Sequence, residues 1–138
     1  MKPVLPQNQL PSELQPVSSS VVFVYGSLKR GYALHHLLST AKYLGTAHSL
    51  PLYRLFDLGQ YPGLVEWPDG VEVAGELYEI TAEELRILDE AEGVDEGLYA
   101  RRTIHLQPSA AGETFSRVEA WFWLRPVAGC RDCGGCWP

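Results

Sequence analysis

The sequence predicts one α+β domain, in which a curved, mostly antiparallel sheet or barrel packs against a single long helix. Short apolar runs, several of them alternating with polar residues, recur through residues 21–128 and are separated by turn residues. One stretch, TAEELRILDEAEG, has clear signals for the start and the end of a helix. The chain has 138 residues, which is enough to bury most of a core without metals or disulfides.

The expected strands are short. VVFV is a buried strand bounded by Gly26, while VEVAGELYEI and RVEAWFWLRP alternate along their length. Trp121 and Trp123 share the strand face opposite Phe122, where they either line a pocket or pack within the sheet. A short helix is expected over residues 32–39. In chain order, strands are predicted at residues 21–24, 53–58, 63–67, 71–80, 99–107 and 117–126.

The long helix has recognisable ends. Thr81 is a natural N-cap, and Glu84, three residues later, completes a capping box. Ile80 and Leu85 stand at the positions of a hydrophobic staple, and Gly93 is well placed for the left-handed residue that follows a helix. A helix between Thr81 and Gly93 is therefore the clearest local prediction.

Glu92 is the first candidate for chemistry. With about 100° of rotation per residue, Leu85, Leu88, Asp89 and Glu92 fall within a sector of about 100°, so that Glu92 lies in the apolar stripe. Burial and the negative end of the helix would both raise the pKa of this carboxyl group towards the range of a general base. The alternative is a solvated acidic residue at a helix end, and Asp89 is the next candidate base.

The stretch VVFVYGSLKRG ends a strand in Gly26, Ser27 and Leu28. Such a strand end can aim several backbone N–H groups at one point, which suits a carboxylate or the oxyanion of acyl transfer. The alternative is an ordinary turn between a strand and a loop. The stretch has neither GxxxxGK[ST] nor GxGxxG, so it is not a phosphate-binding loop of those types.

Five motifs carry a family resemblance. FVYGSLKRG, followed by YPGLV, GELYEI, LDEAEG and YARR, resembles the γ-glutamylcyclotransferase-like superfamily, and more narrowly its AIG2-like and γ-glutamylamine cyclotransferase branch. The resemblance covers residues 22–125 and leaves out the two ends of the chain. It is specific because the motifs occur together and in the expected order.

The resemblance implies a compact mixed β-barrel with a few packed helices, and a cavity that holds a γ-glutamyl group. Glu92 matches the position of the proposed general base, and Arg101 matches a YxR position of functional or structural importance. No metal or organic cofactor is implied. The positions implied to bind substrate are Tyr25, Gly26, Ser27, Leu28 and Tyr99.

The implied reaction cyclises a γ-glutamyl amine or γ-glutamyl amino acid to 5-oxoproline with release of an amine. Two alternatives remain open. One is a non-catalytic member of the superfamily that binds a small molecule or has a regulatory role. The other is a related enzyme that removes γ-glutamyl protection from a biosynthetic intermediate. The choice among glutathione, γ-glutamyl amino acids and γ-glutamylamines is open, as is the oligomeric state.

Charge and the two ends of the chain complete the sequence-based expectations. A formal net charge of −6 argues against a nucleic-acid partner, and no apolar run reaches the length of a membrane span. Residues 1–20 are expected to be a polar, proline-rich leader with little order and without the core of a signal peptide, which suggests a cytoplasmic protein. Residues 129–138 are expected to be a cysteine-rich tail.

All three cysteines, Cys130, Cys133 and Cys136, fall in that tail. The spacing CxxCxxC could hold part of a metal or redox site, but zinc requires four ligands and no histidine is nearby in the sequence. A solvated segment that is prone to oxidation is the favoured interpretation.

Overall fold

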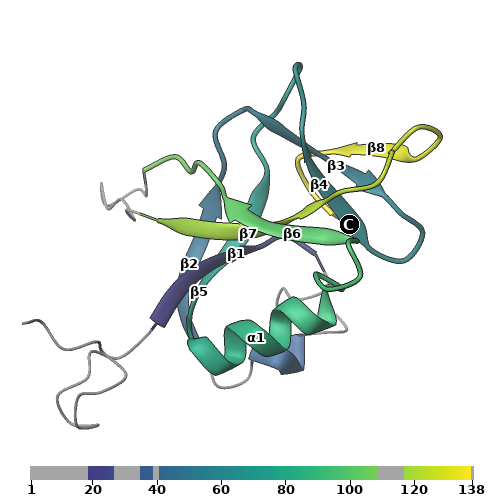
Figure 1. Ribbon diagram of the computed structural model, residues 1–138. Coiled ribbons are helices and arrows are strands. Elements are labelled where there is room, and N and C mark those ends of the chain that lie inside the picture. Colours follow the sequence, from purple (N-terminus) through teal and green to yellow (C-terminus); the bar gives the residue numbers. More distant parts are fainter. Residues whose placement is uncertain (1–18, 27–34, 39–40, 109–116, 138) are drawn as a thin grey trace, which may run out of the picture.

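The computed structural model describes residues 19–26, 35–38, 41–108 and 117–137. Their dominant feature is one mixed sheet that curls into a half-barrel (Figure 1). The expected fold class is thus confirmed. The strands are β1 (Ser19–Val24), β2 (Lys42–His48), β3 (Tyr53–Asp57), β4 (Pro62–Glu66), β5 (Ala74–Thr81), β6 (Tyr99–Thr103), β7 (Val118–Trp123) and β8 (Arg131–Gly134). The helices are η3 (His35–Leu38), a 3-10 turn, and α1 (Ala82–Ala91).

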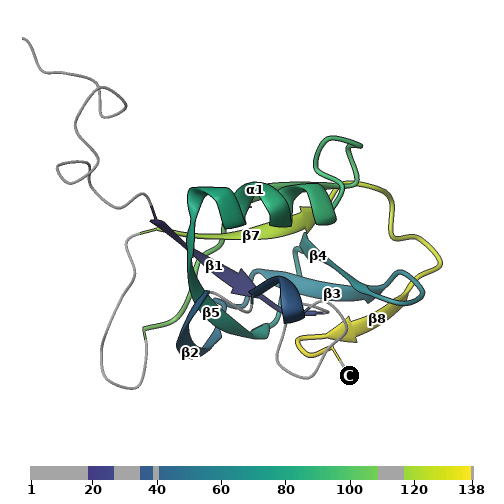
Figure 2. The same cartoon turned by 90° about the horizontal axis from the view of Figure 1, so that it is seen from below.

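The sheet has the strand order β2-β5-β1-β7-β4-β3-β8, and β6 pairs with β7 outside this path. β7 is parallel to β1 and to β4, whereas the other neighbours are antiparallel. Figures 1 and 2 show α1 on one side of the curled sheet, with β8 on the far side of the sheet from it. β1 lies inside the sheet between β5 and β7, and its side chains pack on both of its faces.

This interior position explains the uninterrupted apolar run VVFV at residues 21–24 of β1. A strand that is buried on both faces has no reason to alternate with polar residues. Phe23 and Tyr25 point into the interior of the half-barrel, while Val22 and Val24 pack on the side that faces α1. All four side chains are buried. The interior cluster consists of Phe23, Tyr25, Tyr53, Leu55, Leu64, Val73, Leu77, Ile104, Val118, Ala120 and Phe122.

The helix begins and ends where the sequence predicts. Thr81 accepts a hydrogen bond from the Glu84 backbone N–H, and the Glu84 carboxylate accepts one from the Thr81 backbone N–H, which completes the capping box. Glu92 is the C-cap residue, and Gly93 follows with φ +68°, a left-handed conformation that favours glycine. Leu88, fully buried, anchors α1 to the sheet.

Two strands were not anticipated. β2 forms the edge beside β5 and contains an irregular register next to Gly45, whose φ is +125°. β8 lies within the expected tail: it pairs with β3, and the Gly135 carbonyl then accepts a hydrogen bond from the Ala74 backbone N–H. This segment therefore contributes to the sheet, in contrast to the expectation of a solvated tail.

Other boundaries differ slightly from the predictions. β1 begins at Ser19, within the expected leader. The strand predicted over residues 99–107 is shorter in the structure: β6 ends at Thr103, because only residues 99–103 pair with β7. The described part of the expected helix at 32–39 is the four-residue turn η3. The strand predicted over residues 117–126 ends earlier: β7 stops at Trp123, and Leu124 beyond it is exposed.

The packing of α1 gives the first testable prediction. Truncating Leu88 to alanine should lower the free energy of unfolding by about 2–5 kcal/mol, because it leaves a cavity between α1 and the sheet. Ile87→Ala, one residue earlier on the same helix, is the matched control, because Ile87 is 40% exposed. Urea denaturation measures both variants. Equal losses for the two would contradict this placement of α1.

Candidate active site

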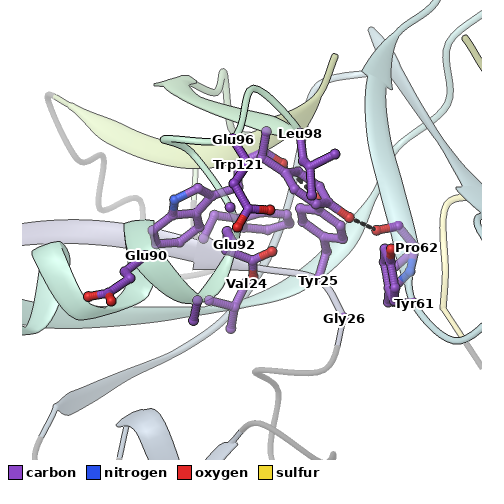
Figure 3. Close-up of a pocket in the computed structure, with 14 residues that line it drawn as sticks. Val24, Tyr25, Gly26, Tyr61, Pro62, Glu90, Glu92, Glu96, Leu98 and Trp121 are labelled. Carbon is purple, nitrogen blue, oxygen red and sulfur yellow. Dashed lines mark hydrogen bonds between the residues drawn. The ribbon is translucent and has the colours of Figure 1, made fainter. Parts of the chain in front are cut away.

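A cavity of about 300 Å³ opens between the end of β1 and the last turn of α1. Figure 3 shows Glu92 reaching into it from the helix, with Tyr25 and Trp121 beside the carboxylate. The loop before β4 and the segment before β6 provide the remaining walls. The lining residues are Phe23, Val24, Tyr25, Gly26, Tyr61, Pro62, Glu90, Ala91, Glu92, Gly93, Glu96, Leu98, Tyr99 and Trp121.

Glu92 owes its place to the way α1 ends. Its backbone N–H donates to the Leu88 carbonyl at 2.9 Å, so the residue completes the last turn above the fully buried Leu88. Gly93 then turns the chain away with its positive φ. A Cβ atom at Gly93 would also lie 3.0 Å from Leu98, another wall residue. The helix end thus directs a carboxylate into the cavity, as the helical periodicity predicted.

The environment of Glu92 favours its neutral form. Burial raises the pKa of this carboxyl group from its usual 4.5 to about 7, because the protein around it solvates the anion poorly. A carboxylate with such a pKa is divided between its two protonation states near neutral pH. It can accept a proton and return it, as a general base that later acts as a general acid must do.

Two buried tyrosines adjoin Glu92. The Tyr25 hydroxyl donates to the Trp121 carbonyl at 2.6 Å, and the Tyr99 hydroxyl donates to the Pro62 carbonyl at 2.8 Å. Burial, together with the negative charge of Glu92, holds the pKa of both phenols well above the usual range. Both therefore stay neutral, and each has its proton committed to a backbone oxygen. Toward other partners these hydroxyls can act only as acceptors.

The predicted substrate-binding loop is described only in part. Tyr25 and Gly26 line the cavity, whereas Ser27 and Leu28 lie outside the described residues. Gly26 has a packing reason to be glycine: a Cβ atom there would stand 2.6 Å from Pro62 Cγ. This close approach brings the end of β1 against the start of β4.

Asp89, the second candidate base, has a different role in the geometry. It is absent from the cavity wall, and its carboxylate accepts from the Trp121 indole N–H at 2.9 Å and pairs with the Arg101 guanidinium. Arg101, predicted to be either functional or structural, also contacts Glu119 at 3.4 Å. The structure therefore places Asp89 and Arg101 behind the cavity wall.

Several wall residues were not predicted from the sequence. Tyr61 and Glu90 fall within the motifs YPGLV and LDEAEG but were not singled out as site residues, and Leu98 and Glu96 lie outside all five motifs. Trp121 was expected either to line a pocket or to pack in the sheet, and it does both. Only the folded arrangement of β1, α1, β4 and β6 reveals these residues as neighbours.

Comparison with known proteins identifies the family of this chain. The family model described as "Gamma-glutamyl cyclotransferase, AIG2-like" matches residues 22–137. The chain belongs to this family. The resemblance seen in the five motifs is thereby confirmed, and the match extends past them to include β8.

Individual relatives support this assignment. The chain is 39% identical over 93 residues to the gamma-glutamylaminecyclotransferase of Bos taurus, covering 62% of this chain and 55% of that protein. It is 36% identical over 112 residues to the gamma-glutamylcyclotransferase family protein YtfP of Escherichia coli K12, covering 80% and 88%. The alignments to the first three curated relatives span only 54 to 63% of their lengths.

Solved structures share the fold. A crystal structure of an AIG2-like protein from Mus musculus superposes with a TM-score of 0.65 at 26% identity, covering 80% of this chain and 79% of that one. A uropathogenic Escherichia coli protein reaches a TM-score of 0.72 at 21% identity, covering 87% and 93%. The second likeness concerns the fold alone.

Within the described residues, no group of three or more His, Cys, Asp or Glu side chains is arranged to hold a metal ion. None of the helices in the described ranges is long and apolar enough to cross a membrane.

The raised pKa of Glu92 gives a prediction about stability. Because the folded state holds the Glu92 proton more tightly than the unfolded state does, the stability that this proton contributes is complete below pH about 4.5. It is lost as the pH rises through about 7. Relative to Glu92→Gln, native protein should lose up to about 3 kcal/mol of unfolding free energy across this range.

Urea denaturation of both proteins at a series of pH values measures the difference. Glu83→Gln, at an exposed position in the first turn of the same helix, is the control and should follow the native curve. A constant difference between native protein and Glu92→Gln from acid to neutral pH would show that Glu92 titrates as an ordinary carboxylate.

Proposed function

We propose that the protein is a γ-glutamyl cyclotransferase in which Glu92 is the general base. The observation that carries the proposal is a carboxyl group with a pKa of about 7, directed into a 300 Å³ cavity at the position where the family resemblance places the base. The substrate class is a γ-glutamyl amine or γ-glutamyl amino acid. The product is 5-oxoproline, released together with the amine. The names of the bovine and Escherichia coli relatives support this class.

The proposed reaction begins at the α-amine of the substrate. This amine is protonated in water and therefore cannot attack a carbonyl group. Glu92 removes one proton, and the amine lone pair forms a bond to the γ-carbonyl carbon. Because amine and carbonyl belong to one molecule, the main task of the cavity is to hold the folded conformer in which they meet.

The second half of the reaction returns the proton. Collapse of the tetrahedral intermediate breaks the bond between the γ-carbon and the leaving nitrogen, and Glu92 protonates that nitrogen as it departs. The ring nitrogen also loses its second proton, and the released amine takes up one more to become an ammonium ion. The ring that remains is 5-oxoproline. Neither an oxidant nor a metal takes part, and the base ends in the state in which it began.

The walls of the cavity support the first step. The α-ammonium group is a donor, and the Glu92 carboxylate is an acceptor at the cavity wall. The Tyr99 hydroxyl donates its proton to the Pro62 carbonyl, so its oxygen can serve as a second acceptor. The negative carboxylate also attracts the cation. We propose that the loop after Gly26 supplies N–H donors to the α-carboxylate or the developing oxyanion; its residues Ser27 and Leu28 are outside the described ranges.

The proposal predicts that Glu92→Gln loses at least about 100-fold in kcat, because glutamine cannot exchange a proton at this position. Native protein and variant are incubated with glutathione, a panel of γ-glutamyl amino acids and a panel of γ-glutamylamines, and 5-oxoproline is measured by mass spectrometry. Glu83→Gln is the matched control and should keep full activity, since its side chain is exposed at the far end of α1.

Equal turnover by native protein and Glu92→Gln would remove Glu92 from the mechanism. Absence of product with every compound, combined with saturable binding of 5-oxoproline measured by calorimetry, would favour the non-catalytic binding protein instead.

A further inference from the structure

A polar cluster lies directly behind the cavity wall. Asp89 on α1, Arg101 on β6, and Glu119 and Trp121 on β7 meet where the helix crosses the sheet. Arg101 and Trp121 are register partners, and Glu119 lies two residues before Trp121 on the same strand. The three side chains therefore project from one face of the sheet, and this is the face on which α1 packs.

The Asp89 carboxylate joins the helix to this face through two different contacts. One oxygen accepts from the Trp121 indole N–H at 2.9 Å, and the other pairs with Arg101. The side chains of Asp89 and Arg101 are each 26% exposed, so the pair is largely withdrawn from solvent. Losing one partner there costs more than losing a pair on the open surface, because the other group is left without compensation.

The Asp89 carboxylate connects the helix turn that holds Glu92 with the cavity wall formed by Trp121. Asp89 precedes Glu92 by three residues, so the two lie on the same side of α1. Trp121, which is 2% exposed, forms the adjoining wall, and its backbone carbonyl accepts the hydrogen bond from Tyr25. One contact network thus runs from Arg101 through Asp89 and Trp121 to Tyr25.

We propose that Asp89 is a positioning residue, which clamps the last turn of α1 to β6 and β7 and so holds Glu92 against the wall formed by Trp121. The catalytic part of this inference rests on the proposed function. Asp89 does not touch the substrate; it fixes the distance between the base and the opposite wall. A displacement of about 1 Å at a reacting group can cost on the order of 100-fold in rate.

The first test follows the clamp without any turnover. In ¹H–¹⁵N spectra, the indole signal that disappears in Trp121→Phe is the signal of Trp121. In Asp89→Ala this signal should move upfield and exchange faster with solvent, because its acceptor is gone. Asp89→Asn keeps a side-chain oxygen and should retain most of the protection. Unchanged shift and exchange in Asp89→Ala would overturn the contact, and with it the clamp.

The second test measures Glu92 itself by its ¹³C carboxyl signal. Release of the last turn should admit water, and the pKa of Glu92 should fall from about 7 toward its usual 4.5 in Asp89→Ala. Asp89→Ala also leaves the Arg101 charge unbalanced, which lowers the same pKa. The other titratable groups at the cavity wall, unchanged in these variants, are Tyr25, Tyr61, Glu90, Glu96 and Tyr99.

The double variant Asp89→Ala/Arg101→Met separates the two effects. If Asp89 is a clamp, the pKa of Glu92 stays low in the double variant, because the turn remains released. If Asp89 acts through charge alone, the pKa returns to about 7 when both charges are removed, and the clamp is overturned. Neither outcome depends on enzymatic activity, so a failure of the proposed function and a failure of the clamp are distinguishable.

The third test uses the substrate found in the panel assay. Asp89→Ala should lower kcat by about 10- to 100-fold with a smaller change in KM, and Asp89→Asn should recover much of kcat. Arg54→Met is the control: it breaks the ion pair of Arg54 with Asp132, neither of which lines the cavity, and the Arg54 side chain is 25% exposed, against 26% for Asp89. A native kcat in folded Asp89→Ala, or an equal loss in Arg54→Met, would overturn the proposal.

Discussion

The site depends on the contact between the last turn of α1 and the sheet. The fully buried Leu88 packs this turn against the sheet. The Asp89 carboxylate holds the same turn through its contacts with Trp121 and Arg101. An apolar contact alone would fix the distance of the helix from the sheet but not its rotation, since dispersion and burial have no direction. The hydrogen bond and the ion pair are directional, so they fix the rotation of the helix. This rotation in turn sets the direction of the Glu92 side chain.

Holding a carboxyl group in this place costs stability at neutral pH. The desolvation that raises the pKa of Glu92 is the same desolvation that makes its ionised form unfavourable in the folded state. A residue selected for stability alone would be apolar here, because Glu92 continues the stripe of Leu85 and Leu88. The exchange of stability for a reactive group is typical of a functional site.

The sequence was informative where local rules decide the structure. The capping box at Thr81 and the glycine at Gly93 locate α1 to the residue, and the helical period then points Glu92 inward. β2 and β8 were missed because their residues do not carry a strand pattern. In β8, RDCG has almost no apolar content, and its pairing with β3 comes from tertiary structure. The wall residues Tyr61 and Leu98 belong to segments whose course no local rule fixes.

The two buried tyrosines add a constraint that no motif reveals. A phenol beside a carboxyl group would ordinarily donate its proton to that group and lower its pKa. Tyr25 and Tyr99 donate instead to the carbonyls of Trp121 and Pro62, so Glu92 keeps the raised pKa that burial creates. Both acceptors belong to the frame of the cavity, one in β7 and one at the start of β4. The backbone carbonyls thus accept both phenolic hydrogen bonds, and the Glu92 carboxylate retains its capacity to accept a proton from a ligand.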